Sequence, residues 1–182
     1  AGEIGLEVVT GDTKVVGRGQ ADKLFINTAG IGLIPAGLNL SPTQIRPGDK
    51  IIVSGLIGEH GLAILAQREG LGFTTPVQSD CGSVHRLAQA LYQIDPAGVL
   101  CMRDPTRGGL ATTLNELAQQ GALCLGIEEE LIPVSAAVRG ACGMLGMDPL
   151  YLANEGKLMA IVAPSKLPEM LDALRALPEG QD

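Results

Sequence analysis

Short hydrophobic runs and one-sided hydrophobic stripes alternate along most of the chain. The run at residues 50–54 predicts a strand, and residues 59–67 predict a helix that Gly70 would end. Residues 83–93 carry hydrophobic side chains at helical spacing, and Asp80 is placed to cap the helix they predict. Because helices and strands alternate, the pattern by itself favours an α/β fold with parallel strands.

The second half of the chain continues the alternation. Asp104 is placed to act as the N-cap of a helix, with Pro105 at the first helical position and Gly121 at the end. Ser135 is placed to cap a later helix. The remaining elements are predicted in the order strand, helix, strand and helix, at residues 123–128, 135–145, 157–163 and 167–177.

The first thirty residues show no helical stripe. Two β-like runs, residues 7–10 and 24–28, flank a polar turn at residues 11–14. Two strands alone bury little surface, so we expect this segment to pair with something larger, either the following domain or a neighbour outside the chain. Residues 31–180 contain no linker, which indicates one domain.

Composition narrows the class of protein. Hydrophobic residues make up 46% and charged residues 18% of the chain, which excludes intrinsic disorder. The net charge of −7 and the 2% aromatic content disfavour nucleic-acid binding, which depends on basic side chains that neutralise phosphates and on aromatic side chains that stack with bases. No hydrophobic run approaches the ~20 residues that a membrane helix needs, and no secretory signal opens the chain. We expect neither nucleic acid nor membrane as a partner.

The cysteines and histidines do not form a metal-binding pattern. The four cysteines lie far apart, without a Cys-x-x-Cys pair, which argues against a zinc site. A chain of this length and hydrophobicity needs no disulfide, so we expect buried, reduced thiols in a cytoplasmic protein. A solitary histidine such as His60 or His85 is more often solvated or hydrogen-bonded than catalytic.

Three polar segments interrupt the hydrophobic pattern, at residues 10–14, 103–109 and 153–157. Each combines a carboxylate, a cation and a glycine, which suits a site for magnesium and phosphate. The same residues also make good turns and helix caps, so a purely structural role stays open for each segment. No P-loop or dinucleotide signature is present, and any ATP must be held by another architecture.

At these segments the sequence resembles the HypE family of hydrogenase maturation proteins, within the superfamily of aminoimidazole ribonucleotide synthetase and selenophosphate synthetase. The resemblance rests on four stretches in family order: VTGDTKVV, FINT followed by GIG, MRDPTRGGLA followed by LNE, and YLANEGK. It implies an α+β fold with a mixed, largely antiparallel sheet and packed helices, in place of the parallel sheet.

The resemblance also implies a division of the chain. Residues 1–30 would be the terminal strands of an N-terminal ATP-binding domain that is missing here. Residues 31–182 would be the C-terminal α+β domain, without the flexible tail that carries a reactive cysteine in the family. We therefore expect the chain by itself to be inactive.

The activity implied by the resemblance is the ATP-dependent dehydration of an S-carbamoyl cysteine to a thiocyanate, which supplies cyanide to a nickel–iron centre. Lys14 and Glu155 fall where the family places the groups that polarise and deprotonate the carboxamide. An ordinary glutamate is too weak a base for an amide N–H, so O-phosphorylation must acidify that proton or burial must raise the glutamate pKa. The positions that would face Mg²⁺ and phosphate are Asp12 and Asp104, and those that would contact phosphate are Thr106 and Arg107.

ATP and Mg²⁺ are the implied cofactors. The implied partners are a carbamoyltransferase (HypF), an iron-carrying scaffold complex and, at full length, a second copy of the protein. Two alternatives stay open. One is a selenophosphate synthetase-like enzyme, which would need a reactive cysteine or selenocysteine near its N-terminus. The other is a non-catalytic docking module, in which the polar segments are only turns and caps.

Overall fold

The computed structural model describes residues 1–21, 23–68 and 76–181. The chain forms two compact units, Ala1–Pro35 and Ala36–Asp182. No helix within the described ranges is long and hydrophobic enough to cross a membrane. The predicted helix end at Gly70 lies outside the described residues.

In the first unit the backbone is mostly extended. A short 3-10 turn, η1 (Gly2–Ile4), is the one regular element among its described residues. The runs at residues 7–10 and 24–28 pair with no strand of the described chain, so their expected role as strands of a larger domain stays a prediction. Their hydrophobic side chains are exposed, as with Val8 at 79% and Phe25 at 75%. An extended segment becomes a strand only when its backbone groups find a partner.

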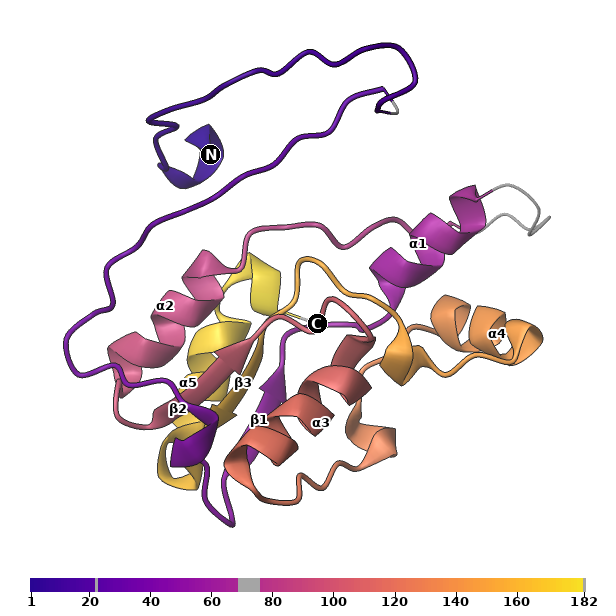
Figure 1. Ribbon diagram of the computed structural model, residues 1–182. Coiled ribbons are helices and arrows are strands. Elements are labelled where there is room, and N and C mark those ends of the chain that lie inside the picture. The colour runs from indigo at the N-terminus through magenta and orange to yellow at the C-terminus, as the bar shows by residue number, and fades with distance from the viewer. Residues whose placement is uncertain (22, 69–75, 182) are drawn as a thin grey trace. The chain divides into compact units, whose positions relative to one another are not determined.

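The second unit is built around a three-stranded sheet with the order β1-β3-β2 (Figure 1). The strands are β1 (Lys50–Val53), β2 (Val99–Arg103) and β3 (Met159–Val162). Both pairings are antiparallel. The α+β class is therefore confirmed and the parallel sheet is wrong, because alternation shows the order of elements but not the direction of strands.

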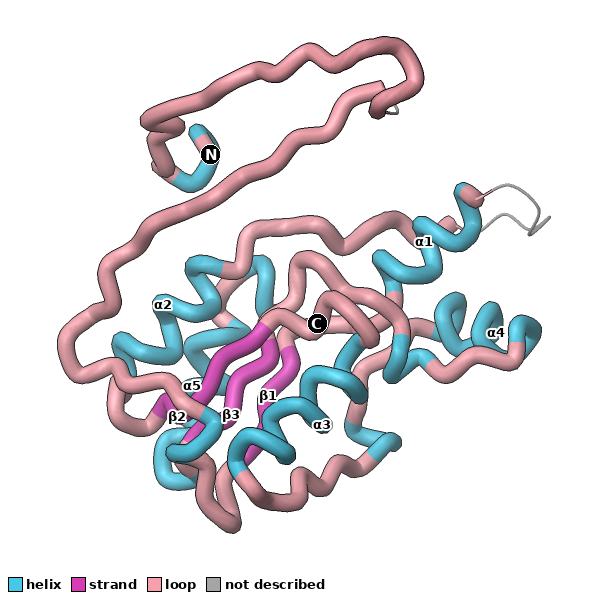
Figure 2. The backbone as a smooth tube through the Cα atoms, in the orientation of Figure 1, coloured by secondary structure: helices cyan, strands magenta, loops and turns pink. Residues whose placement is uncertain are grey.

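Helices lie on both faces of this sheet (Figure 2). The α-helices of the described chain are α1 (Glu59–Gln67), α2 (His85–Ile94), α3 (Gly109–Gly121), α4 (Ala136–Leu145) and α5 (Leu167–Arg175). Short 3-10 turns connect them: η2 (Pro42–Gln44), η3 (Glu129–Leu131), η4 (Pro149–Tyr151), η5 (Pro164–Lys166) and η6 (Pro178–Gly180). Apart from the strand at residues 123–128, each element predicted after residue 46 appears within a few residues of its expected position.

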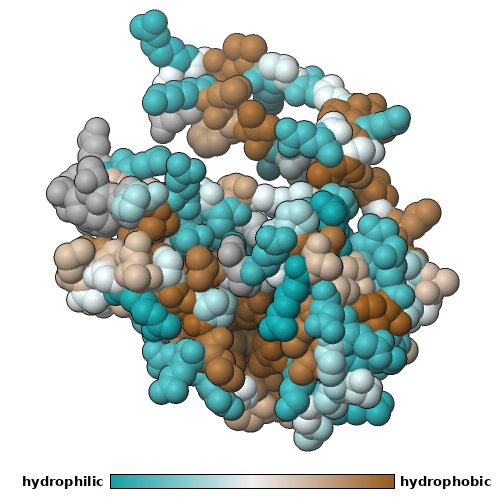
Figure 3. Space-filling model, turned by 180° about the vertical axis from the view of Figure 1, so that it is seen from behind, coloured by the Kyte–Doolittle hydropathy of each residue, from teal (hydrophilic) through white to brown (hydrophobic). Residues whose placement is uncertain are grey.

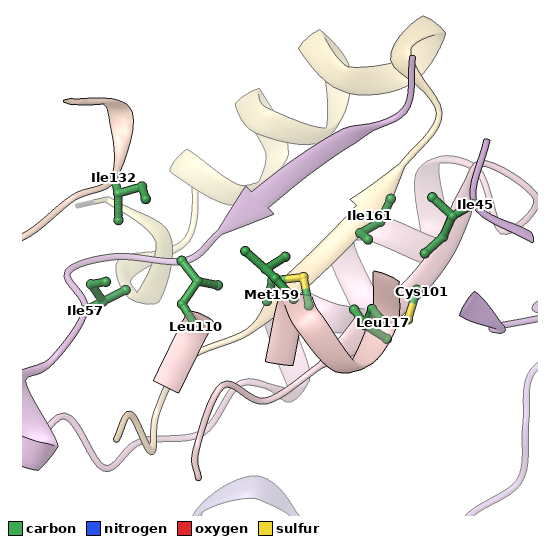
Figure 4. Packing of buried hydrophobic residues seen from close by; sticks show 9 residues of the cluster. Ile45, Ile57, Cys101, Leu110, Leu117, Ile132, Met159 and Ile161 are labelled. Atoms are coloured by element: carbon green, nitrogen blue, oxygen red, sulfur yellow. The ribbon is translucent and has the colours of Figure 1, made fainter. Parts of the chain in front are cut away.

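The central strand β3 divides the core into two layers. All four of its residues are buried, and its side chains alternate between the faces, as strand geometry requires. Met159 and Ile161 pack with α3 residues on one face (Figure 4). Ala160 and Val162 pack with residues of α2 and α5 on the other. A third cluster joins α1 to α4 through Leu62, Val138, Ala141, Cys142 and Leu152.

Two of the three predicted helix caps are wrong. Helix α2 begins at His85 with Val84 as its N-cap, and Asp80 instead accepts a hydrogen bond from the Glu155 N–H. Helix α3 has Gly108 as its N-cap, while Asp104 accepts a hydrogen bond from Thr106 Oγ1. In each case the carboxylate accepts from a donor outside the helix terminus. Ser135 does cap α4, where its hydroxyl accepts from the Val138 N–H.

Residues 123–128, predicted as a strand, pair with no other strand. Together with β1 they line an open cavity of about 830 Å³. The hydrophobic side chains of Leu123 and Leu125 pack against the α3 side of the core without joining the sheet. Hydrophobic surface gathers in a hollow on the face shown in Figure 3. The hydrophobic run thus reflects core packing and not sheet pairing.

All four cysteines are free. Cys101 and Cys142 are buried, and burial raises the pKa of both thiols; Arg103 opposes the rise at Cys101, and Asp148 adds to it at Cys142. Cys81 and Cys124 are exposed. The expectation of buried thiols is therefore confirmed for two cysteines and wrong for the two that lie in loops.

Candidate functional site

Two of the three polar segments, residues 103–109 and 153–157, meet in the second unit. The residue that joins them is Asn154, which is fully buried. Its Oδ1 accepts a hydrogen bond from the Gly58 N–H at 2.7 Å, and its Nδ2 donates to the carbonyls of Pro105 at 2.9 Å and Leu152 at 3.0 Å. One amide therefore ties together the loops that follow β1 and β2 and the loop that precedes β3.

Helix α3 begins against the same turn. Gly109, its first residue, has a φ of +65°, and a Cβ at this position would lie 2.6 Å from the carbonyl oxygen of Leu152. Only glycine allows this close approach. The positive end of the α3 dipole therefore lies beside residues 150–152 and directly follows Thr106 and Arg107.

The predicted phosphate and magnesium residues of the second unit lie in the loop between β2 and α3. Asp104 and Arg107 are exposed and Thr106 is half-buried. The Thr106 hydroxyl donates to Asp104 Oδ2 at 2.8 Å, and the neighbouring Arg103 pairs with Glu116 at 3.3 Å. Asp104 shapes its own loop and still presents its carboxylate to solvent, so structural and ligand-binding roles are compatible.

Glu155 follows the buried Asn154 and turns outward. Its side chain is 40% exposed, and its Oε1 lies 3.7 Å from Nε2 of His60 on the first turn of α1. Its backbone N–H donates to Asp80 Oδ1 at 3.2 Å. The Asp80 side chain is 2% exposed and its Oδ2 lies 3.8 Å from Lys157 Nζ, the nearest charged partner. The candidate base is thus exposed at its carboxylate and fixed at its backbone.

Asp12 and Lys14 belong to the first unit. The Asp12 carboxylate accepts a hydrogen bond from the Thr13 N–H at 2.8 Å, as in a tight turn. Lys14 is exposed. The convergence of Lys14 with Glu155, and of Asp12 with Asp104, stays a prediction.

The residues present fit Mg²⁺ only as a partial site. Within the ranges that the structure describes, no group of three or more His, Cys, Asp and Glu side chains could hold a metal ion alone. Mg²⁺ is commonly held by one or two carboxylates together with substrate phosphates and water. The exposed oxygens of Asp104 suit that kind of site.

The cavity of about 830 Å³ lies elsewhere. Its lining comes from β1, residues 123–128 and neighbouring core side chains, and includes none of the six predicted site residues. The candidate site is therefore a surface where loops converge.

Sequence reasoning missed three residues of this site: Asn154, His60 and Asp80. Asn154 stands within a polar segment, but its burial and its distant partners leave no local signal. His60 follows Glu59 at the start of a helix, where a solvated histidine is the ordinary expectation. Asp80 resembles a helix cap, and its actual partner is 75 residues away along the chain.

Comparison with curated proteins finds close relatives. The chain is 52% identical over 182 residues to the carbamoyl dehydratase HypE of Bradyrhizobium diazoefficiens, covering 100% of this chain and 53% of the relative. It is also 52% identical over 182 residues to the carbamoyl dehydratase HypE of Azotobacter vinelandii, again covering 100% of this chain and 53% of the relative. The chain thus spans about half the length of these relatives.

Solved structures show the same likeness. The crystal structure of Escherichia coli HypE matches with a TM-score of 0.86 at 44% identity, covering 93% of this chain and 52% of the other. A HypE–HypF complex matches with a TM-score of 0.76 at 37% identity, covering 80% and 48%. A HypE structure in complex with ATP matches with a TM-score of 0.71 at 46% identity, covering 78% and 42%.

A family model accounts for most of the second unit. Residues 46–181 match the model described as "AIR synthase related protein, C-terminal domain". This range includes β1, β2 and β3, all five α-helices of the described chain, and the converging loops around Asn154. The chain therefore belongs to the family of AIR synthase related proteins, of which it carries the C-terminal domain.

Proposed function

We propose that the chain is the C-terminal part of an ATP-dependent carbamoyl dehydratase that acts in hydrogenase maturation. The observation that carries the proposal is the convergence of two polar segments at the buried Asn154, in a chain 52% identical over its whole length to named carbamoyl dehydratases. The substrate is an S-carbamoyl cysteine, and the product is a thiocyanate that supplies cyanide to a nickel–iron centre.

The proposed reaction removes water from the carboxamide in two stages. The amide oxygen attacks the γ-phosphorus of ATP and ADP leaves, which places a phosphate on that oxygen. The nitrogen then loses both of its protons, the C–O bond breaks, and phosphate departs with the former amide oxygen. The carbon and nitrogen are left as a nitrile on sulfur.

Lys14 and Glu155 divide the proton chemistry in this proposal. Lys14 polarises the carboxamide and stabilises the charge that develops on its oxygen. Glu155 accepts a proton from nitrogen. An ordinary carboxylate is a weak base for an unactivated amide N–H. The proposed order therefore puts O-phosphorylation first, since phosphorylation acidifies the N–H.

ATP and Mg²⁺ belong to the proposal as well. A solved HypE structure contains ATP, and we expect the same of the protein that carries this chain. Asp104 and Asp12 would hold Mg²⁺, which neutralises phosphate charge when bound. Thr106 and Arg107 would contact phosphate beside the positive end of the α3 dipole.

Partners and chain organisation follow from the same proposal. A HypE–HypF complex is known, and we propose HypF as the carbamoyl donor here. We also propose an iron-carrying scaffold as the acceptor of cyanide, a homodimer at full length, and a cytoplasmic location, which the four free thiols support. Residues 1–30 would complete an N-terminal ATP-binding domain, which the exposed hydrophobic side chains of this segment support.

The test replaces Lys14 or Glu155 with alanine in the full-length protein. Thiocyanate formation is followed by mass spectrometry on S-carbamoylated protein mixed with ATP and Mg²⁺, under single-turnover conditions. We expect each variant to lose far more than tenfold in rate, a barrier increase above ~1.4 kcal/mol.

Lys23→Ala and Glu130→Ala serve as matched controls, because each removes an exposed charge of the same type outside the candidate site. Both should react at the rate of the unaltered protein. Retention of more than about a tenth of the rate in Lys14→Ala or Glu155→Ala would refute that residue's role. A protein that binds HypF but shows no ATP-dependent reaction would favour the docking-module alternative.

A further inference from the structure

We infer that His60 is a positioning residue, which orients the Glu155 carboxylate from the first turn of α1. The inference rests on the proposed function, because it gives His60 a role through the proposed base. From the sequence alone, His60 is expected to be an ordinary solvated histidine at the start of a helix.

The first turn of α1 is docked directly onto the turn that carries Glu155. The Gly61 N–H donates to the Ala153 carbonyl at 2.9 Å, and Gly58, the residue before the helix, donates to Asn154 Oδ1. These contacts lie on either side of His60. The imidazole, 19% exposed, therefore faces Glu155 from a fixed backbone.

The other ring nitrogen of His60 is held by Ser79. The Nδ1 atom lies 2.8 Å from Ser79 Oγ, and that oxygen also accepts from the Cys81 N–H at 3.3 Å. The Ser79 hydroxyl has one proton to donate. It gives that proton either to Cys81 Sγ, at 3.2 Å, or to His60 Nδ1. When the hydroxyl donates to Nδ1, the ring proton sits on Nε2 and faces the Glu155 carboxylate.

The same loop also fixes the backbone of Glu155. Asp80, the residue after Ser79, accepts the Glu155 N–H through Oδ1, and its Oδ2 faces Lys157. Gly156 packs so closely on the Asp80 carbonyl and the Gly82 nitrogen that no Cβ would fit there. Residues 79–82 thus hold the Glu155 main chain directly and the carboxylate through His60.

This arrangement limits the rotamers of an otherwise exposed glutamate. The distance of 3.7 Å between His60 Nε2 and Glu155 Oε1 exceeds a hydrogen bond, and such contacts tighten when substrate is bound. A base displaced by about 1 Å can lose on the order of a hundredfold in rate. His60 therefore contributes to the rate of proton removal and not to the binding of ATP.

The experiment compares His60→Gln with His60→Asn in the full-length protein. A glutamine amide reaches toward the position of Nε2 and Glu155, whereas an asparagine amide reaches toward Nδ1 and Ser79. We expect single-turnover thiocyanate formation to fall about ten- to a hundredfold in His60→Asn and His60→Ala, and His60→Gln to recover at least about fivefold of that loss. The ATP concentration for half-maximal rate should stay unchanged in all three variants.

His85→Asn provides the matched control, because His85 is the other histidine of the chain and its Nδ1 bonds to Ser83 Oγ at 2.6 Å. It should react at the unaltered rate. If Glu155→Ala is slow while His60→Asn and His60→Gln both stay within twofold of the unaltered protein, the positioning role is overturned and the proposed function stands. If Glu155→Ala is fast, the proposed role of Glu155 as the base is refuted, and the positioning role of His60 is refuted with it. Equal losses in His60→Asn and His60→Gln would make His60 merely structural.

Discussion

At the scale of single residues, the neutral Asn154 ties the loops of the site together. Its amide satisfies one N–H and two carbonyls that belong to three different stretches of chain. Groups buried in this way cost free energy when they lose a partner, whereas exposed pairs such as Arg103 with Glu116 contribute little. The geometry around Glu155 therefore depends on a neutral residue.

We predict that Asn154→Ala lowers the free energy of unfolding by about 3 kcal/mol, because it leaves the Gly58 N–H and the Pro105 carbonyl without their partner. Asn154→Asp should also be destabilising, because a carboxylate cannot donate to the two carbonyls. Urea denaturation followed by circular dichroism measures both changes. Asn39→Ala, at an exposed position, should stay within about 0.5 kcal/mol of the unaltered chain. A loss below about 1 kcal/mol in Asn154→Ala would show that the three loops are held by other contacts.

At the scale of elements, the hydrophobic pattern predicted the positions of most helices and strands, which depend on neighbouring residues. The hydrophobic stripes of α2 and α3 and the buried run of β3 are recovered, because burial of one face defines each element. The hydrophobic pattern gave the wrong strand direction, whereas the family resemblance implied the antiparallel pairing that is observed. The free segment at residues 123–128 and the partner of Asp80 were not predicted. Each depends on residues far away in the sequence, as with the 96 positions between Gly58 and Asn154.

The candidate site also has a part that the sequence predicts and a part that depends on distant contacts. The residue types of the polar segments already indicated phosphate chemistry. Asp104, in one of these segments, and Asp80, outside them, were both expected to cap helices, but each accepts a hydrogen bond from another group. Nothing in the order of residues 58–61 indicates that they meet residues 152–155. The convergence results from the packing of the N-termini of α1 and α3 against the turn before β3, and only tertiary packing reveals it.

The close fit of α3 on that turn leads to a prediction about Gly109. Gly109→Ala adds a Cβ at a φ of +65° and within 2.6 Å of the Leu152 carbonyl oxygen, so we expect a loss of about 2 to 4 kcal/mol in unfolding free energy. Gly140→Ala, in the exposed middle of α4 with open space around it, should gain about 0.5 to 1 kcal/mol. Thermal and urea unfolding of both variants measure whether each substitution lowers or raises the unfolding free energy. Equal stabilities would mean that α3 can shift without cost.

At the scale of the whole molecule, the two units differ in how they bury hydrophobic surface. Every buried hydrophobic residue of the described chain lies between Ile45 and Leu174, within the second unit. The first unit exposes hydrophobic side chains, among them Val9, Ile26 and Ile31 at 87%, 80% and 104%. A segment with this exposure needs a hydrophobic partner, which the proposed ATP-binding domain would supply.

Because the first unit contributes no side chain to the buried core, we predict that residues 36–182 fold on their own. Deleting residues 1–35 should change the unfolding free energy by less than about 0.5 kcal/mol, as expected for independent parts. It should also reduce binding of a hydrophobic dye, since exposed hydrophobic surface is removed. Deleting residues 167–182 is the contrasting control: it removes Met170 and Leu174 from the core and should abolish cooperative unfolding. A loss above about 1 kcal/mol without residues 1–35 would show that this segment packs on the second unit and stabilises it.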